Sequence, residues 1–178
     1  MAMTSASRPT SPERAPTMEP GCDSTAPDGG AAPAIHLEWV NPRKSLSRPG
    51  LVYTSARGTP TTFHLRHTCV LMARPMGKGQ TALFFAASAD SFAVRALAQV
   101  YKTFSTRRYD LDSGMSAIFE GHSKVFDANG EELSGVLPDL EGWIVHALIT
   151  LRGKWESGYH TGLRLEVAQI QLVQPLWD

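Results

Sequence analysis

The sequence predicts a mostly β domain with one main helix, and three observations support this fold class. Apolar and polar residues alternate along several segments, with the period of two residues that a half-buried strand requires. Only residues 88–104 carry apolar side chains at the three- and four-residue steps of a helix. Gly and Pro residues separate these segments, as they do at turns. A chain of 178 residues is long enough for one such domain and an additional segment.

The additional segment is residues 1–34, which contain six prolines and no aromatic residue. Such a segment cannot bury enough apolar surface to offset the entropy of ordering it, so we expect a disordered N-terminal tail. It also lacks the apolar run of a secretory signal. We therefore assign the folded domain to residues 35–178.

In the first part of the domain the sequence predicts three strands and a fourth strand that pairs back on the third. Residues 36–40 end at Asn41-Pro42, and residues 51–56 form a second strand or continue the first. Residues 62–74 alternate over their whole length, and after a turn residues 81–87 complete a hairpin. The mostly apolar face of the long strand is expected to hold Phe63, Leu65, His67, Cys69, Leu71 and Ala73.

The helix is predicted over residues 88–104, where Ala93, Leu97, Val100, Tyr101 and Phe104 share one face. A strand at 116–120 and a turn around 127–130 follow, and this turn allows one extra hairpin. Two long strands, at 143–151 and 163–173, end the domain, with a loop expected between them. A one-residue change of apolar register in the last strand indicates a β-bulge.

This element order matches a five-stranded Greek-key barrel of the OB type with an extra hairpin. In that barrel the helix is expected after the third strand, and the second and third strands with nearby loops form the binding face. A β-sandwich with one crossing helix is the alternative.

Residues 142–173 resemble the last strands of phage-type single-stranded-DNA-binding proteins. The segment reads GWIVHALITL, then Trp155 and Gly158, and finally GLRLEVAQIQLV. In that family a strand leads to a loop bearing Trp or Tyr, a glycine follows, and the last strand carries an apolar-Gln-apolar stretch. The resemblance covers about a fifth of the chain. The long acidic tail that often recruits replication partners in such proteins is replaced here by the short ending QPLWD.

The resemblance implies a non-catalytic protein that binds single-stranded DNA during replication or recombination of a phage or other mobile element. Replication or recombination proteins are candidate protein partners, and a homo-oligomer is left open. No stretch approaches the ~20 apolar residues of a membrane span. Cys22 and Cys69 are poorly placed to form a disulfide, which favours a reducing compartment and a cytoplasmic location.

The charges of the chain are unevenly distributed, although its net charge is zero. Residues 36–108 contain eleven Lys or Arg and two acidic residues, a net charge of +9, whereas residues 109–178 carry −7. The local potential, rather than the net charge, attracts a polyanion. In the alternative arrangement the two halves interleave in space and neutralise each other.

A protein that binds single strands without sequence preference needs a cationic groove and flat rings on which bases stack. On the alternative interpretation, the cations form a solvated strand face and the aromatic rings belong to the core. The predicted nucleic-acid-binding residues are Arg43, Lys44, Arg48, Tyr53, His64, Arg66, Arg74, Lys78, Phe84, Lys102, Arg107, Arg108, Lys154, Trp155 and Tyr159.

No motif in the sequence predicts catalysis, a metal or a cofactor. Within HLRHTC only His67 and Cys69 share a strand face, and structural zinc needs four ligands. The Gly77-Lys78 pair lacks the earlier glycine of a phosphate-binding loop. We therefore expect a protein that is not an enzyme. The alternative function is a β-rich protein-interaction module or accessory factor that uses the acidic region 110–141.

Overall fold

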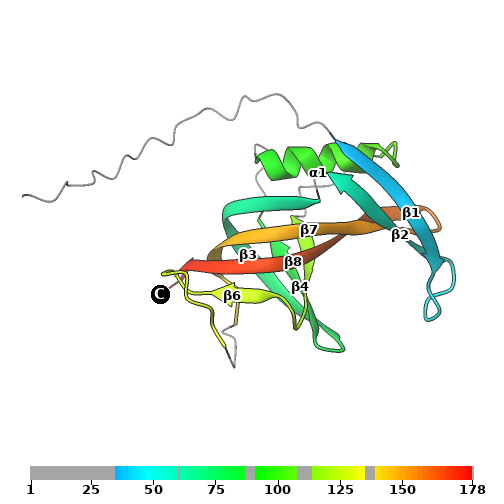
Figure 1. Ribbon diagram of the computed structural model, residues 1–178. Helices are drawn as coiled ribbons and strands as arrows, with labels where there is room; N and C mark the ends of the chain where they lie inside the picture. Colours follow the sequence, from blue (N-terminus) through cyan, green and yellow to red (C-terminus); the bar gives the residue numbers. More distant parts are fainter. Residues whose placement is uncertain (1–34, 60, 87–90, 108–113, 135–138, 178) are drawn as a thin grey trace, which may run out of the picture.

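The computed structural model describes residues 35–59, 61–86, 91–107, 114–134 and 139–177 (Figure 1). The predicted tail, residues 1–34, lies outside the described residues. In chain order the elements are β1 (His36–Lys44), β2 (Leu51–Thr59), β3 (Thr62–Gly77), β4 (Gln80–Phe85), α1 (Phe92–Lys102), β5 (Met115–Phe119), β6 (Lys124–Phe126), β7 (Trp143–Ser157) and β8 (His160–Pro175).

Five of these strands close into a barrel. Their order is β3-β4-β5-β8-β7, and β7 pairs with β3 to complete the circle. The β5–β8 pairing is parallel, and the other four barrel pairings are antiparallel. This is a five-stranded Greek-key barrel of the OB type, as the element order predicted. No helix among the described residues is long and apolar enough to cross a membrane.

The remaining strands are attached outside the barrel. β1 and β2 form a hairpin that pairs with the end of β7 and projects to the lower right in Figure 1. β6 pairs in parallel with β8 and is followed by the turn expected around 127–130. The barrel therefore begins at β3, and α1 follows its second strand. The sequence predicted the helix after the third barrel strand, because that prediction included one of the outer strands in the barrel.

Helix α1 lies across the top of the barrel in Figure 1. Its apolar face, including Ala93, Leu97 and Val100, is buried in the same core as Val70, Leu83 and other barrel residues. This confirms the predicted helix face. Burying a Leu or Val side chain stabilises a fold by roughly 1.5–3 kcal/mol, so the helix contributes to the barrel core as well as covering it.

The burial pattern of β3 differs from the single apolar face that the sequence predicted. Phe63 and Leu65 are buried, but further along the strand Val70 is buried and Leu71 is 53% exposed. The pairing of β3 with β7 shifts between Leu65 and Thr68, and His67 adopts a φ of 50°. One extra residue in a strand exchanges its buried and exposed faces, which explains the difference.

The predicted loop 152–162 is instead a continuation of the β7–β8 hairpin. β7 runs to Ser157 and β8 begins at His160, so Trp155 belongs to a strand. The pairing moves from Leu148–Gln169 to Ile149–Val167, which confirms the bulge predicted in the last strand. The long hairpin places Trp155 opposite Tyr53 of β2.

Candidate nucleic-acid interface

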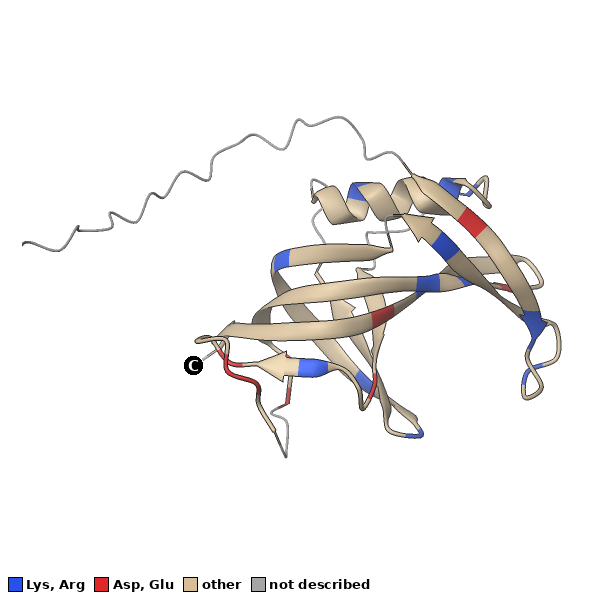
Figure 2. Cartoon of the chain, viewed as in Figure 1, with Lys and Arg blue, Asp and Glu red and all other residues tan. Residues whose placement is uncertain are grey.

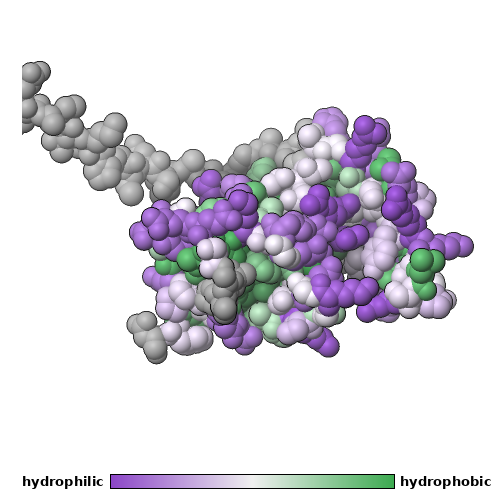
Figure 3. All heavy atoms as spheres, turned by 60° about the horizontal axis from the view of Figure 1, so that its bottom comes forward, coloured by the Kyte–Doolittle hydropathy of each residue, from purple (hydrophilic) through white to green (hydrophobic). Residues whose placement is uncertain are grey.

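Two adjoining hollows of about 490 Å³ and 500 Å³ form a groove on the outer face of β4 and β5. Both hollows are lined by Arg48, Met76, Ser116 and Ile118. The groove, called here the β4–β5 groove, is bounded by the β1–β2 loop, the β3–β4 hairpin and the β7–β8 hairpin. Figure 3 brings the lower side of the molecule in Figure 1 forward and shows a mainly hydrophilic surface with small apolar patches.

The floor of the groove follows from strand alternation. Gln80, Ala82 and Phe84 of β4 line it, whereas Leu83 and Phe85 point into the core and are buried. As expected for two consecutive phenylalanines in a strand, one of Phe84 and Phe85 lies outside the core. Their partners on β5, Ser116 opposite Phe84 and Ile118 opposite Ala82, complete the floor.

One wall of the groove is a row of side chains across four strands. Arg43 pairs with Tyr53, Tyr53 with Trp155, and Trp155 with Gly162. Directly opposite residues project to the same face, so the two rings lie side by side. A Cβ atom at Gly162 would be 2.6 Å from the Trp155 ring, and the indole therefore lies against the bare glycine backbone. Tyr53 and Trp155 both remain partly exposed.

The cations of the groove come from three hairpins. Arg48 lies in the β1–β2 loop, Arg74 near the end of β3, and Arg164 on β8. The Arg164 guanidinium is 5.6 Å from the centroid of the Tyr53 ring and 3.3 Å from a Glu166 oxygen. Arg48 and Arg74 form no ion pair with any other described residue. Within the described part of the chain, the groove therefore has two cations without an ion-pair partner beside its aromatic rings.

The two oppositely charged halves of the sequence do not neutralise each other by direct pairing in the described part of the chain. All five ion pairs there join residues between positions 120 and 166. Figure 2 shows the acidic residues gathered mainly beside β6 and in the loop after it, whereas Lys and Arg mark the hairpins and the barrel.

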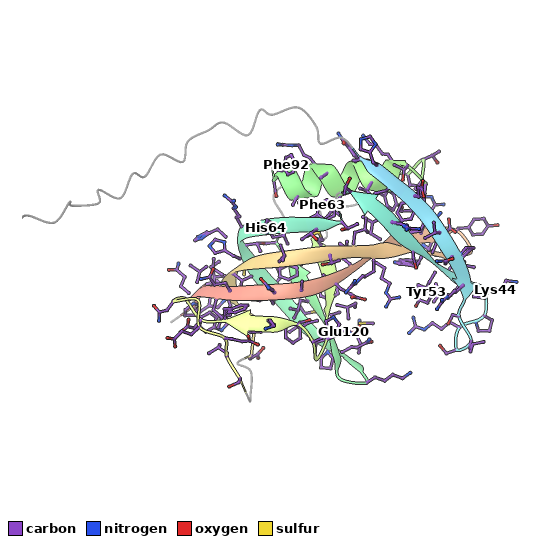
Figure 4. The ribbon with its side chains drawn as sticks, in the orientation of Figure 1. Lys44, Tyr53, Phe63, His64, Phe92 and Glu120 are labelled. Carbon is purple, nitrogen blue, oxygen red and sulfur yellow. The ribbon has the colours of Figure 1, made fainter. Side chains whose placement is uncertain are left out.

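Glu120 is the acidic side chain among the described residues that line the groove, and Figure 4 labels it at the lower part of the barrel, with Tyr53 on the projecting hairpin to its right. The Gln80 amide donates a 2.7 Å hydrogen bond to the Glu120 carboxylate. His122 lies 3.5 Å from its other oxygen and can pair with it when protonated. The carboxylate is thus held at one side of the groove, where it lowers the local positive potential.

Five predicted residues line the groove: Arg48, Tyr53, Arg74, Phe84 and Trp155. Arg43 shares the face of Tyr53 at the outer strand β1. Lys78 and Tyr159 occupy the turns at the ends of the β3–β4 and β7–β8 hairpins, and Tyr159 is 87% exposed. The two turns border the groove without lining it.

The other predicted residues lie elsewhere. Lys154 projects to the opposite face of its strand, where its ammonium lies 4.9 Å from the Phe104 ring centroid and 3.0 Å from Glu156. Lys44 lies on that same opposite face, because it pairs with Val52 rather than Tyr53. Lys102 is the last residue of α1 and Arg107 follows the helix, and both line neither hollow.

His64 and Arg66 line a separate hollow, and Arg108 lies outside the described residues. Sequence reasoning missed Arg164, Met76, Gln80 and Glu120 in the groove. The polar position of Arg164 between Leu163 and Leu165 was a usable signal, because alternation places it on the outer face. Among the described residues, no three His, Cys, Asp or Glu side chains gather in a way that could hold a metal ion.

No protein-family model matches this sequence, and no curated protein does either. Among solved structures, the chain is similar to the single-stranded DNA-binding protein from bacteriophage Enc34, with 13% identity and a TM-score of 0.38 over 79% of this chain and 94% of that one. The structure of the Enc34 protein in complex with ssDNA gives 12% identity and a TM-score of 0.36 over 76% and 94% of the two chains.

Proposed function

We propose that this protein binds single-stranded DNA in the β4–β5 groove and catalyses no reaction. The observation that carries the proposal is that Tyr53 and Trp155 line the same groove as Arg48 and Arg74, and that the second and third barrel strands form its floor. OB barrels bind oligonucleotides on this face. Stacking rings next to a positive groove are the two features that binding of single strands without sequence preference requires.

In this proposal each group has a distinct role. The guanidinium groups of Arg48 and Arg74 contact phosphates, which gives affinity that depends on salt. The rings of Trp155, Tyr53 and Phe84 offer flat faces to successive bases, and base stacking on an aromatic ring contributes about 1–3 kcal/mol per base. A duplex hides its base faces inside the stack, so the same groove favours an unpaired strand.

We also propose that the protein acts in the cytoplasm, in replication or recombination of a phage or other mobile element. The sequence resemblance over residues 142–173 supports this role. Replication or recombination proteins are the protein partners to test. Assembly of this chain into a homo-oligomer stays a prediction.

The test of the proposal is fluorescence anisotropy with labelled oligo-dT and a labelled duplex at two salt concentrations. We expect oligo-dT binding to weaken as salt is added. A plot of the logarithm of the binding constant against the logarithm of the salt concentration should have a slope of about −0.7 for each phosphate contacted. We expect weaker binding of the duplex at both concentrations. Failure to bind oligo-dT would reject the proposal and favour the alternative interaction module that uses region 110–141.

A further inference from the structure

A second hollow lies on the outer face of β3, β7 and β8 and shares no lining residue with the β4–β5 groove. Its volume is about 550 Å³. Its lining includes the polar and aromatic side chains of His64, Arg66, Phe126, His146, Gln169 and Gln171. Figure 4 labels His64 at the left of the barrel, on the other side from Tyr53.

Strand pairing assembles these side chains in two parallel rows. In one row His64 pairs with Leu148, Leu148 with Gln169, and Gln169 with Lys124. In the other row His146 pairs with Gln171, and Gln171 with Phe126. Paired residues project to the same face, so two imidazoles, two amides, one lysine and one aromatic ring share one surface.

Most hydrogen-bond donors of the second hollow are available to a ligand, although the Gln171 amide donates a long bond of 3.5 Å to the Ala128 carbonyl. His64, Arg66 and His146 form no ion pair with another described residue. The Nδ1 atom of His146 accepts a 3.0 Å hydrogen bond from the backbone N–H of His67. The neutral His146 ring therefore carries its proton on Nε2 and can donate from there.

Two of the carboxylates near the second hollow, those of Glu132 and Asp127, are already engaged. Glu132 pairs with Lys124 at 2.8 Å. The Asp127 carboxylate accepts backbone hydrogen bonds of 2.8 Å from Glu131 and 2.9 Å from Asn129. The bond from Glu131 is the main cause that lowers the pKa of Asp127, which keeps this group ionised within its own turn. Glu131 itself is exposed in the same turn.

A strip of β7 and β8 connects the second hollow with the β4–β5 groove. Arg152 and Arg164 flank the buried Glu166 at 2.6 Å and 3.3 Å, and about half of each Arg side chain stays exposed. Two cations on one carboxylate leave the strip with net positive charge. Along β7 the outer face runs from Trp155 in the groove to His146 in the hollow.

We propose that the second hollow binds a further segment of the same DNA strand that occupies the β4–β5 groove. This inference rests on the proposed function. Arg66 and His64 contact phosphates, Phe126 offers its ring to a base, and the Gln169 and Gln171 amides donate to and accept from base edges. The site is a separate one, because OB-type binding uses the face of the second and third strands and the loops beside it.

The test compares two oligonucleotide lengths on a His64→Ala, Arg66→Ala double variant. Site sizes of OB folds run from about 4 to 16 nucleotides, so we use dT oligomers of about 4 and 16. The matched control is Arg57→Ala, which removes an exposed cation of β2 that lines neither hollow. His64 and Arg66 are both exposed, so the double variant is expected to fold, and circular dichroism checks this.

We expect the double variant to bind the long oligomer more weakly, with a salt slope shallower by about 0.7 for each phosphate that the variant no longer neutralises. Its affinity for the short oligomer should equal that of the control. Equal affinity of variant and control for the long oligomer would overturn the second site. An equal weakening for both lengths would also overturn it, because the two residues would then act on the main groove. If the wild-type protein binds neither length, the proposed function itself fails.

A second variant, Gln169→Glu, adds a negative charge to the exposed surface of the hollow without removing a core side chain. We expect it to weaken binding of the long oligomer only. Unchanged binding of the long oligomer by this variant would contradict a phosphate path across the hollow.

Discussion

At the scale of single residues, Gly162 determines where the Trp155 ring lies. Any larger residue would place its Cβ atom 2.6 Å from the indole, so only glycine allows the ring to rest on the β8 backbone. The ring is thereby fixed beside Tyr53 with one side open to the groove. A stacking surface that is held in place before binding loses less conformational entropy when a base arrives.

Replacing Trp155 with Ala should weaken oligo-dT binding by about 1–3 kcal/mol, because one stacking surface is removed. Anisotropy titration at constant salt measures the change. The matched control is Trp177→Ala, which removes a tryptophan that is 77% exposed and outside the groove. Equal affinities of the two variants would show that Trp155 does not stack on a base.

Replacing Glu120 with Gln should strengthen oligo-dT binding, since it removes the negative charge from the groove and keeps a side chain that can accept from Gln80. Partly exposed charges interact by on the order of 0.2–1 kcal/mol, so the gain in affinity is a few-fold. The gain should shrink at high salt, where the interaction is screened. A decrease in affinity would mean that the carboxylate contacts the ligand favourably, contrary to this account.

At the scale of elements, alternation predicted where the strands are but not which face of each strand is buried. Residues 62–74 carry polar or small side chains on both faces, so no pattern marked the shift between Leu65 and Thr68. That shift and a second one between Val70 and Met72 bend the strand, and Arg66 and Arg74, which were expected on one face, line different hollows. In β7 the shift between Leu151 and Gly153 turns Lys154 away from the groove and Trp155 into it.

The turn between β3 and β4 offers a test at this scale. Lys78 and Gly79 both have positive φ, 53° and 72°, which is the conformation of a type I′ turn that favours Asn-Gly. Lys78→Asn should therefore stabilise the fold by roughly 1 kcal/mol, which corresponds to about 2–4 °C in Tm for a chain of this size. Thermal unfolding measures this.

The control for this prediction is Lys78→Ala, which removes the same charge without the tolerance of Asn for positive φ. The account predicts no gain in Tm for this control. A lower Tm for Lys78→Asn than for the wild-type protein would show that the turn does not limit the stability of the hairpin.

At the scale of the whole molecule, the uneven charge of the sequence led to the hypothesis of a surface that attracts a polyanion, but it predicted no individual contact. The excess of cations before residue 108 includes Arg48 and Arg74, which are both exposed in the structure. It could not show that these two residues meet Tyr53 and Trp155, since that meeting depends on the β1–β2 hairpin pairing with the end of β7. The groove is thus assembled by long-range strand pairing, both within the barrel and between the β1–β2 hairpin and β7.

The salt dependence of oligo-dT binding by an Arg48→Ala, Arg74→Ala variant tests the central claim most directly. The matched control is Arg57→Ala, Lys102→Ala, which removes two exposed cations outside the groove. Each phosphate that is no longer neutralised reduces the slope by about 0.7, so the account predicts a slope shallower by about 1.4 for the groove variant and an unchanged slope for the control. Equal slopes for the two variants would contradict the assignment of the β4–β5 groove as the DNA-binding site.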